Sequence, residues 1–149
     1  MRIAVLNGPN LNLLGVREPQ VYGRTTLAEV EARLADVARE LGVEVECAQD
    51  NHEGALVDHV QGYRGRIQGA IVNAGAYTHS SLALRDALMA VEVPFVEVHV
   101  SNVYARELER QRSMLAPAAV GLIVGLGTQG YELALRGLVA LLRGRGAGA

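Results

Sequence analysis

Short apolar runs alternate along the chain with longer stretches in which apolar and polar residues repeat with a helical period. The apolar runs are nearly continuous, as is typical of strands in a parallel sheet that is covered on both faces. They predict five strands, at residues 2–6, 43–48, 69–74, 94–100 and 119–125. The amphipathic stretches predict four helices, at residues 27–41, 54–64, 80–91 and 129–143.

The first predicted helix has clear signals at both ends. Thr26 and Glu29 form a capping box at its start, and Gly42 follows the last apolar position as a typical stop. Strands that alternate with helices predict an open, doubly wound α/β fold. Because the chain carries no internal repeat and no linker, we expect a single domain over residues 1–149. The Gly- and Arg-rich residues 143–149 are expected to form a flexible tail.

The segments that follow strands one, three and four are the most polar and least regular parts of the chain. They are NGPNLNLLGVREPQVYG (7–23), NAGAYTHSS (73–81) and HVSNVYARELER (99–110). Right-handed crossovers place these segments along one edge of the sheet, where doubly wound folds bind their ligands. The first segment is crowded with Asn, Gly and Pro, so no helix is expected in it. We therefore expect a functional site at this edge.

Composition excludes several classes of function. The 149 residues carry a formal net charge of −2 and a pI of about 6.1, so nothing indicates a nucleic-acid or anionic-membrane partner. No apolar run approaches the roughly 18 residues of a membrane helix, and the N-terminus does not resemble a signal peptide. The single cysteine, Cys47, fits a buried thiol in a reducing compartment, so we expect a cytoplasmic protein. All 14 basic residues are Arg, which excludes a lysine Schiff base and a P-loop lysine.

One motif resembles a nucleotide-binding loop. GLGTQG (125–130) matches G-x-G-x-x-G, but it follows the last predicted strand rather than the first. It also lacks the acidic residue expected about 20 positions further on. A tight strand-to-helix turn is the better interpretation, although an anion at that helix N-terminus stays possible in principle.

Glu97 and His99 alternate with valines, so both side chains face one side of the fourth strand. The pair could bind zinc, yet no comparable ligand set accompanies it. We favour the alternative, in which the carboxylate orients an imidazole that acts as a general acid.

Other polar residues fit ordinary structural roles. His59 fits a solvated helix face and Glu53 the first turn of a helix. Arg85 and Asp86 could be exposed charges on their helix. Packing in or next to a predicted helix explains four of the five tyrosines, but it does not explain Tyr22. The four are Tyr63, Tyr77, Tyr104 and Tyr131.

Over roughly residues 2–142 the chain resembles the type II 3-dehydroquinate dehydratases. The resemblance rests on the ordered blocks NGPNLNLLGVREPQVYG, NHEG, NAGAYTHSSLALRDAL, VEVHVSN and GLIVGLGTQGYELAL. The chain departs from the family pattern at Asp50, where Ser is common, at Tyr104, where His is frequent, and at Glu109, where an aromatic residue is frequent. The last two departures bear on packing after the fourth strand.

The resemblance implies a flavodoxin-like sheet and reversible loss of water from 3-dehydroquinate in the shikimate pathway, with no metal and no organic cofactor. It implies a homododecamer of four trimers, in which Asp86 enters a neighbouring subunit's site. The implied catalytic set is Tyr22 as base, Arg17 as its activating partner, His99 as acid, Glu97 as the carboxylate that orients it, and Asn10 as the holder of a water on the enolate oxygen. Arg106 is implied as a second cation near the base. The implied substrate-binding set is Asn73, His79, Val100, Ser101 and Arg110, besides Asp86.

This assignment gives a tyrosine in a turn-rich loop a chemical purpose. An unperturbed tyrosine has a pKa of about 10, so only about 0.1% is ionised at pH 7. A nearby cation such as Arg17 favours the phenolate, and a mobile loop can close over the substrate and exclude water. Without lysine, the reaction is expected to pass through an enolate. The resemblance implies that Tyr22 and His99 flank the substrate from opposite faces, which gives anti elimination. Two other classes remain open: a non-catalytic flavodoxin-like binding module and a nucleotide-dependent oxidoreductase.

Overall fold

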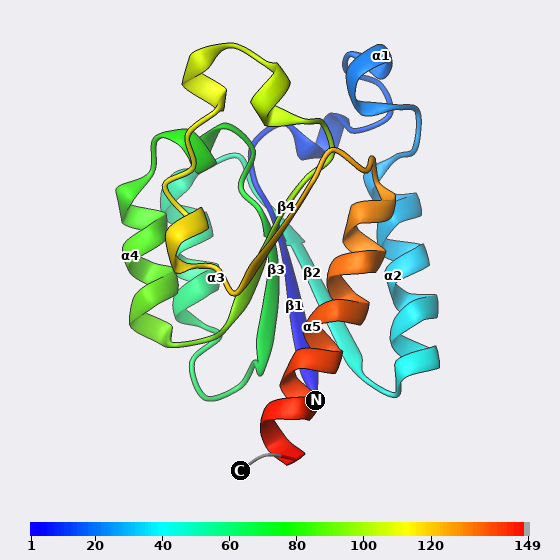
Figure 1. Ribbon diagram of the computed structural model, residues 1–149, viewed down its shortest axis with the longest axis vertical. Coiled ribbons are helices and arrows are strands. Elements are labelled where there is room, and N and C mark those ends of the chain that lie inside the picture. Colours follow the sequence, from blue (N-terminus) through cyan, green and yellow to red (C-terminus); the bar gives the residue numbers. More distant parts are fainter. Residues whose placement is uncertain (148–149) are drawn as a thin grey trace.

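A five-stranded sheet forms the centre of the molecule (Figure 1). The computed structural model describes residues 1–147. All neighbouring strands are parallel and their order is β2-β1-β3-β4-β5, which is the flavodoxin-like order. The strands are β1 (Arg2–Asn7), β2 (Glu44–Gln49), β3 (Gly69–Asn73), β4 (Phe95–His99) and β5 (Gly121–Val124). The predicted five-stranded, doubly wound α/β architecture is confirmed.

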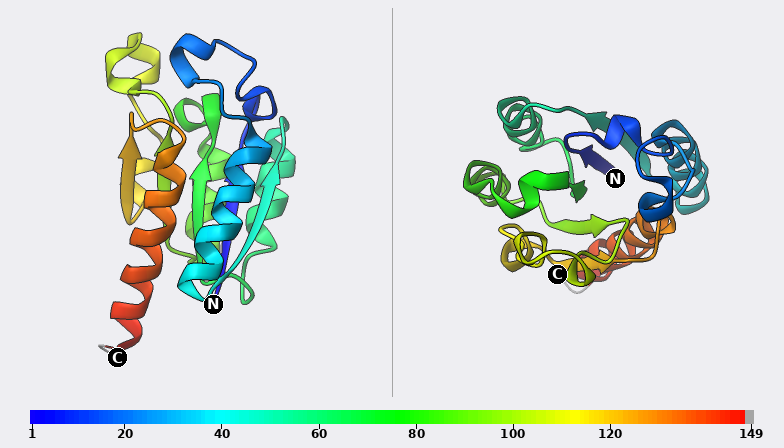
Figure 2. Two further views of the ribbon diagram at one scale, coloured as in Figure 1. Left: turned by 90° about the vertical axis from the view of Figure 1, so that its right-hand side faces the viewer. Right: turned by 90° about the horizontal axis from the view of Figure 1, so that it is seen from above.

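Four long helices cover the two faces of the sheet (Figures 1 and 2). Helices α2 (Leu27–Leu41) and α5 (Gln129–Ala147) pack together on one face. Helices α3 (Glu53–Gln61) and α4 (Leu82–Val91) pack together on the other. None of the helices within the described residues is long and apolar enough to cross a bilayer.

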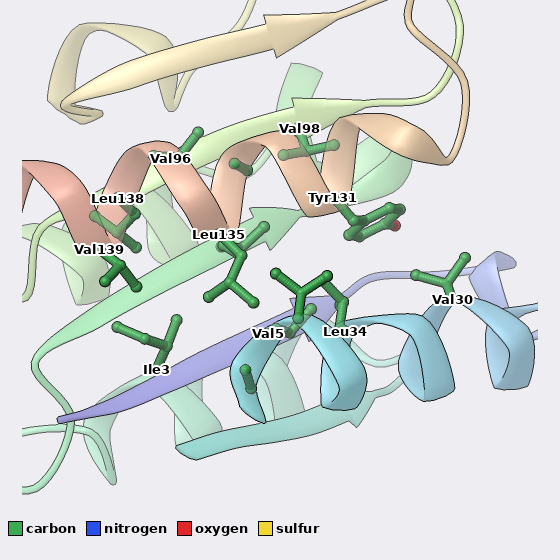
Figure 3. Close-up of a cluster of buried hydrophobic side chains, with 14 of the residues drawn as sticks. Ile3, Val5, Val30, Leu34, Val96, Val98, Tyr131, Leu135, Leu138 and Val139 are labelled. Carbon is green, nitrogen blue, oxygen red and sulfur yellow. The ribbon is translucent and has the colours of Figure 1, made fainter. Parts of the chain in front are cut away.

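Burial on both faces explains why the strands are almost continuously apolar. In β1, Ile3 and Val5 belong to the core on the α2/α5 side, whereas Ala4 and Leu6 belong to the core on the α3/α4 side. Successive residues of a strand point to opposite faces, so a doubly covered strand needs apolar residues at every position. Figure 3 shows the first core, where side chains from the sheet meet those of the two helices.

The stop at Gly42 and one of the two hydrogen bonds of the predicted capping box are confirmed for α2. The Thr26 hydroxyl accepts a hydrogen bond from the Glu29 amide at 3.2 Å, which satisfies a free donor of the first turn. Gly42 ends the helix with φ of 69°, a left-handed conformation that favours glycine. These local signals therefore set the helix bounds without help from the rest of the fold.

The helix expected over residues 129–143 continues to Ala147. Leu142 packs against the α2/α5 core and the Arg143 guanidinium donates to the Leu41 carbonyl oxygen. The flexible tail over residues 143–149 stays a prediction, and residues 148–149 lie outside the described part of the chain. The expectation that no helix follows β1 was wrong. The loop after β1 contains one helical turn, α1 (Pro19–Tyr22), which begins at a proline, a favoured first residue of a helix.

The tyrosine expectation holds for most positions. Tyr63 and Tyr131 are buried, and Tyr77 is partly buried against the α3/α4 core. Tyr104 is 53% exposed, so packing within this chain does not explain it and the expectation was wrong there. It lies in the short turn η3 (Val103–Ala105), which projects from the sheet after β4.

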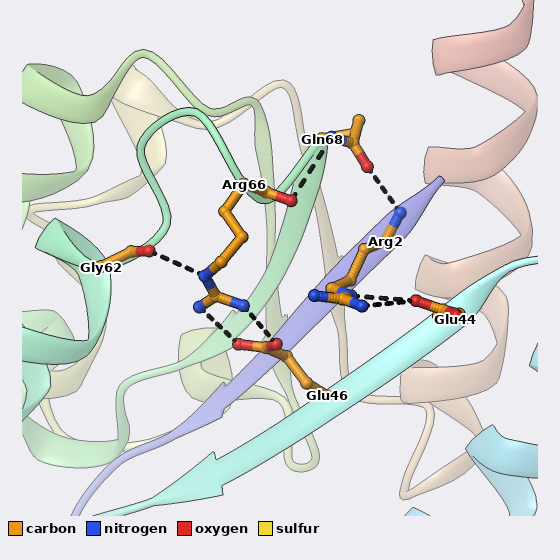
Figure 4. A network of polar contacts seen from close by, with 6 residues as sticks. All are labelled: Arg2, Glu44, Glu46, Gly62, Arg66 and Gln68. Atoms are coloured by element: carbon orange, nitrogen blue, oxygen red, sulfur yellow. Dashed lines mark hydrogen bonds and ion pairs between the residues drawn. The ribbon is translucent and has the colours of Figure 1, made fainter.

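Two arginine–carboxylate pairs lie toward the amino-terminal edge of the sheet (Figure 4): Arg2 of β1 contacts Glu44 of β2, and Arg66, in the loop before β3, contacts Glu46 of β2. The Arg66 guanidinium makes two bonds to Glu46, at 2.6 and 2.9 Å, and Arg2 makes two to Glu44, at 3.0 and 2.8 Å. The pair with Arg66 lowers the pKa of Glu46. Exposed pairs of this kind contribute little to stability, about 0–1 kcal/mol each. The polar residues at the opposite edge require a different explanation.

Candidate active site

The loops after β1, β3 and β4 surround a pocket at the carboxyl edge of the sheet, where a site was expected. Ten of the twelve predicted site residues line it: Asn10, Arg17, Tyr22, Asn73, His79, His99, Val100, Ser101, Arg106 and Arg110. Glu97 lies behind the lining, with 1% of its surface exposed. Asp86 is exposed on α4 and does not line the pocket of its own chain.

Two guanidinium groups flank the Tyr22 ring. The Arg106 Nη1 donates to the Tyr22 hydroxyl at 2.6 Å, and this hydrogen bond is the main cause of a raised pKa of Arg106. The central carbons of the guanidinium groups of Arg17 and Arg106 lie 5.3 and 5.6 Å from the centre of the ring. Sequence reasoning gave Arg17 the leading role, whereas the direct hydrogen bond comes from Arg106, 84 residues away. Both guanidinium groups therefore place a positive charge beside Tyr22.

The loop that carries Tyr22 combines strain with an anchor. Glu18, just before α1, has φ of 44°, an uncommon conformation for a residue with a side chain, and the next residue is Pro19. The Tyr22 ring is partly buried against the α2/α5 core, which holds the end of the short helix on the body of the protein. The hydroxyl therefore faces the pocket from a loop that is fixed at one point.

Glu97 and His99 lie on one face of β4, as predicted, and form a buried pair. The distance from His99 Nε2 to Glu97 Oε2 is 3.4 Å, and the two residues are 6% and 1% exposed. The other carboxylate oxygen, Oε1, accepts a hydrogen bond from the Ser113 hydroxyl at 2.5 Å. This contact lies within ion-pair distance but is not a hydrogen bond, because the buried Nε2 of His99 has no hydrogen-bond partner among the described residues.

The second histidine of the pocket stacks on the first. The rings of His79 and His99 lie 6.3 Å apart, at an angle of 22°. The Nδ1 of His79 donates to the carbonyl oxygen of Arg112 at 2.8 Å, so Nε2 is the nitrogen left free for other partners. The structure thus brings together two imidazoles, one from the end of β4 and one from the segment that follows β3.

A buried hydrogen-bond chain forms the floor of the site. The Nδ2 of Asn73 donates to the Tyr131 hydroxyl at 2.8 Å, and that hydroxyl donates to Asn7 Oδ1 at 2.5 Å. Asn7 and Asn73 are paired across β1 and β3. Burial raises the pKa of Tyr131 far above its ordinary value, so its hydroxyl remains a neutral donor. Asn73 is therefore held at both ends, since its Oδ1 accepts from the Gly75 amide at 3.2 Å.

Asn10 has a left-handed backbone, with φ of 69°, which asparagine adopts more readily than most residues. Its amide donates to Asn51 Oδ1 at 3.0 Å, and Gln49 Nε2 donates to the same oxygen at 3.2 Å. The preceding turn is tight as well, because a Cβ on Gly8 would lie 2.3 Å from the carbonyl oxygen of Ala74. The loops after β1, β2 and β3 thus fix Asn10 together.

The glycine-rich motif is a tight strand-to-helix turn, as predicted. It joins β5, the last strand, to α5, and Gly125 and Gly127 have φ of 85° and 66°. Their amides donate to the carbonyl oxygens of His99 and Val100, at 3.1 and 3.0 Å. Amides that support the end of β4 are not free for a phosphate, so this turn does not favour a dinucleotide site.

Metal ligands do not cluster in the described part of the chain. No group of three or more His, Cys, Asp or Glu side chains there has an arrangement that could hold a metal ion. Glu97 and His99 therefore form a pair without a third ligand among residues 1–147.

Three residues that position the site were not predicted. Ser113 contacts Glu97, Asn51 contacts Asn10, and Tyr131 contacts Asn73. Asn51 lies in the NHEG block, so its position next to a family-like motif was a usable signal. Tyr131 lies in the family-like block GLIVGLGTQGYELAL and so carried the same kind of signal, whereas Ser113, whose partner is 16 residues away, lies in none of these blocks.

The fold and the pocket together define a flavodoxin-like α/β enzyme with acid–base side chains on the loops at the carboxyl edge of its sheet. The chain belongs to the dehydroquinase class II family, whose model matches residues 1–139. It is 61% identical over 142 residues to a 3-dehydroquinate dehydratase of Gemmatimonas aurantiaca, covering 95% of this chain and 93% of that protein. It is 56% identical over 133 residues to a catabolic 3-dehydroquinase of Penicillium rubens, and the match covers 89% of this chain and 86% of that protein.

Solved structures agree with the family. A type II dehydroquinase from Butyrivibrio crossotus superposes with a TM-score of 0.91 at 42% identity, covering 94% of this chain and 97% of that one. A 3-dehydroquinate dehydratase-like protein from Bifidobacterium longum gives a TM-score of 0.70 at 32% identity, and the match covers 95% of this chain and 98% of that one.

Replacing Asn51 by Ala removes the acceptor of the Asn10 amide, so Asn10 is expected to leave its left-handed conformation. We expect kcat/KM with 3-dehydroquinate, the substrate named for the relatives, to fall about 5- to 10-fold, as for one lost hydrogen bond of about 1 kcal/mol. Asn12→Ala is the matched control: it shortens an exposed side chain of the same loop that does not bond to Asn10. Equal effects of the two variants in steady-state assays would contradict this role for Asn51.

Proposed function

We propose that this chain catalyses the reversible dehydration of 3-dehydroquinate to 3-dehydroshikimate, a step of the shikimate pathway, without a metal or organic cofactor. One observation carries the proposal: Tyr22 with its two guanidinium groups and the buried Glu97–His99 pair line or back the same pocket. Family membership supports the substrate, because relatives with 51–61% identity carry the name 3-dehydroquinate dehydratase.

The proposed first step is removal of a proton next to the ketone by Tyr22. Arg106 donates to its oxygen and Arg17 lies over its ring, so the phenolate is the form these contacts favour. Guanidinium groups suit this role because they cannot lose their own proton at working pH. Closure of the loop that carries Arg17 and Tyr22 would exclude water from the base.

The proposed intermediate is an enolate. A chain without lysine cannot form an imine through a side-chain amine, so hydrogen bonds have to stabilise the charge on the ketone oxygen. Asn10 lines the pocket, and its backbone is fixed by Asn51. We assign it the role of holding a water molecule on that oxygen.

The proposed second step is loss of the hydroxyl group, with His99 as the acid. A hydroxyl is a poor leaving group until it is protonated, and Glu97 favours the protonated imidazole that can supply the proton. We propose that Tyr22 and His99 act from opposite faces of the substrate, which gives anti elimination. Substrate binding is assigned to pocket residues at the end of β3 and in the segments that follow β3 and β4: Asn73, His79, Val100, Ser101 and Arg110.

Asp86 is proposed to act in a neighbouring subunit. Its carboxylate is exposed on α4, where Leu82 and Met89 on the same face are 54% and 56% exposed. An exposed carboxylate between large apolar side chains fits a surface that a second copy covers. We propose a dodecamer of four trimers, in which Asp86 reaches the substrate bound by the next chain.

The first test is a spectrophotometric assay with Tyr22→Phe as its partner variant. Purified protein mixed with dehydroquinate alone is expected to develop the ultraviolet absorbance of a conjugated enone, whereas an oxidoreductase or a binding module would not. Removing the phenol oxygen is expected to lower kcat at least about 100-fold, within the usual range for a general base. Near-normal turnover by a folded Tyr22→Phe protein would refute its role as base.

The His99→Ala variant separates the two steps. Without the acid, loss of the hydroxyl is expected to slow more than removal of the proton. Exchange of the substrate α-proton in D2O, followed by NMR, is therefore expected to survive better than dehydration. If both rates fell to the same extent, His99 would act earlier or would support the structure.

Mixing Asp86→Ala with Tyr22→Phe subunits tests the shared site. Each variant alone is expected to be nearly inactive, but after reassembly a site with its own Tyr22 and a neighbour's Asp86 is complete. In a closed ring this restores about a quarter of the wild-type activity in an equal mixture. A fully active monomer in sedimentation would contradict the proposal, and so would an absence of recovery under conditions in which separated wild-type subunits reassemble.

A further inference from the structure

The hydroxyl of Ser113 has one proton, and the geometry commits it to Glu97. Ser113 lies between the turn η4 (Leu108–Arg110) and the turn η5 (Ala116–Ala118). Its oxygen accepts hydrogen bonds from the amides of Leu115 and Ala116, at 3.1 and 3.0 Å. A hydroxyl offers two acceptor positions and one donor. With both acceptor positions occupied, the proton points to Glu97 Oε1, at 2.5 Å.

Glu97 depends on this hydrogen bond. Its carboxylate is 1% exposed, so water does not compensate its charge. In the described part of the chain, the Ser113 hydroxyl is the one recorded hydrogen-bond donor to it, and His99 Nε2 at 3.4 Å is its one ion-pair partner. A buried charge is costly unless it is paired and hydrogen-bonded. Without Ser113, the carboxylate would have no donor that fixes its plane relative to the imidazole.

We infer that Ser113 is a positioning residue for the acid of this site: it orients the Glu97 carboxylate, and through it the ring of His99. The inference rests on the proposed function, in which His99 protonates the leaving hydroxyl. The segment around Ser113 is itself fixed to the other histidine loop. The Arg112 carbonyl accepts from His79 Nδ1, at 2.8 Å, and the Met114 amide donates to the Thr78 carbonyl, at 2.8 Å.

The experiment compares Ser113→Ala with Ser113→Thr, which keeps the hydroxyl, and with Ser81→Ala. Ser81 is the matched control, because its hydroxyl is also enclosed and also caps a turn by accepting an amide, that of Leu84 at 2.9 Å, but it lies outside the pocket. Ser113→Ala is expected to lower kcat for dehydration about 10- to 100-fold, as expected for a lost hydrogen bond to a charged group. Exchange of the α-proton should fall much less, and Ser113→Thr should restore most of the dehydration rate.

A double-mutant cycle with Glu97→Gln tests whether Ser113 acts through Glu97. In that background, Ser113→Ala is expected to have a further effect of less than about 3-fold, because the carboxylate it orients is absent. If Ser113→Ala lowered kcat as much in the Glu97→Gln background as in the wild type, the inference would be overturned. Equal losses in the rates of α-proton exchange and dehydration would also overturn it, and so would a Ser113→Ala variant whose rates match those of Ser81→Ala. If Ser113→Ala does not fold, Ser113→Cys replaces it. The thiol is of similar size but is a weak hydrogen-bond donor, so the same loss of kcat for dehydration is expected.

The nitrogen NMR signals of the imidazole rings give a readout that does not need activity. His99 is expected to change its tautomer or ring signals in Ser113→Ala, while His52 and His59, which lie outside the pocket, stay as internal references. Unchanged His99 signals would overturn the inference. If the wild-type protein does not dehydrate dehydroquinate, the proposed function is wrong, and the NMR comparison still decides whether Ser113 positions His99.

Discussion

The parallel pairing of β1, β3 and β4 is the constraint on which the site depends. In parallel strands the carboxyl ends meet at one edge, so the polar residues that end each strand converge without any special arrangement of the loops. Asn7 and Asn73 are register partners there, and the buried hydroxyl of Tyr131 joins them. The apolar faces of the same strands bury the sheet on both sides. Because the strands run in parallel, the apolar core lies on the two faces of the sheet and the polar residues lie at its carboxyl edge.

Most of the fold was predictable because its signals are local. A doubly covered strand has to be apolar at each position, and a helix shows its period and its caps within a few residues, as α2 does with Thr26 and Gly42. The end of α5 was not predictable in this way. Its glycines indicate a tail, but Leu142 and Arg143 find partners in the core and on Leu41, and those contacts join residues about 100 positions apart.

The distinction between local signals and long-range contacts also applies to the candidate site. The residues that face the pocket were predictable from strand ends and the family resemblance, because their chemistry is visible in the sequence. The contacts that hold them were not, because Ser113, Asn51 and Tyr131 are ordinary residue types whose roles come from partners at least 16 residues away. The hydrogen bond to Tyr22 was not predictable from sequence spacing for a related reason. Arg17 lies five positions from Tyr22, yet Arg106 on a different loop makes the hydrogen bond.

In the proposed reaction, the base and the acid obtain their charge states in opposite environments. The Tyr22 hydroxyl lies on a partly exposed loop and receives its hydrogen bond from Arg106, on the loop after β4. The imidazole of His99 is buried beside Glu97, whose other oxygen is held by Ser113 further along that same loop. Residues 99–113 therefore support both the base and the acid. Arg106 places a cation beside Tyr22, and Ser113 holds the carboxylate beside His99. A displacement of this segment would weaken the base and the acid together, so the geometry ties the two steps of the reaction to one loop.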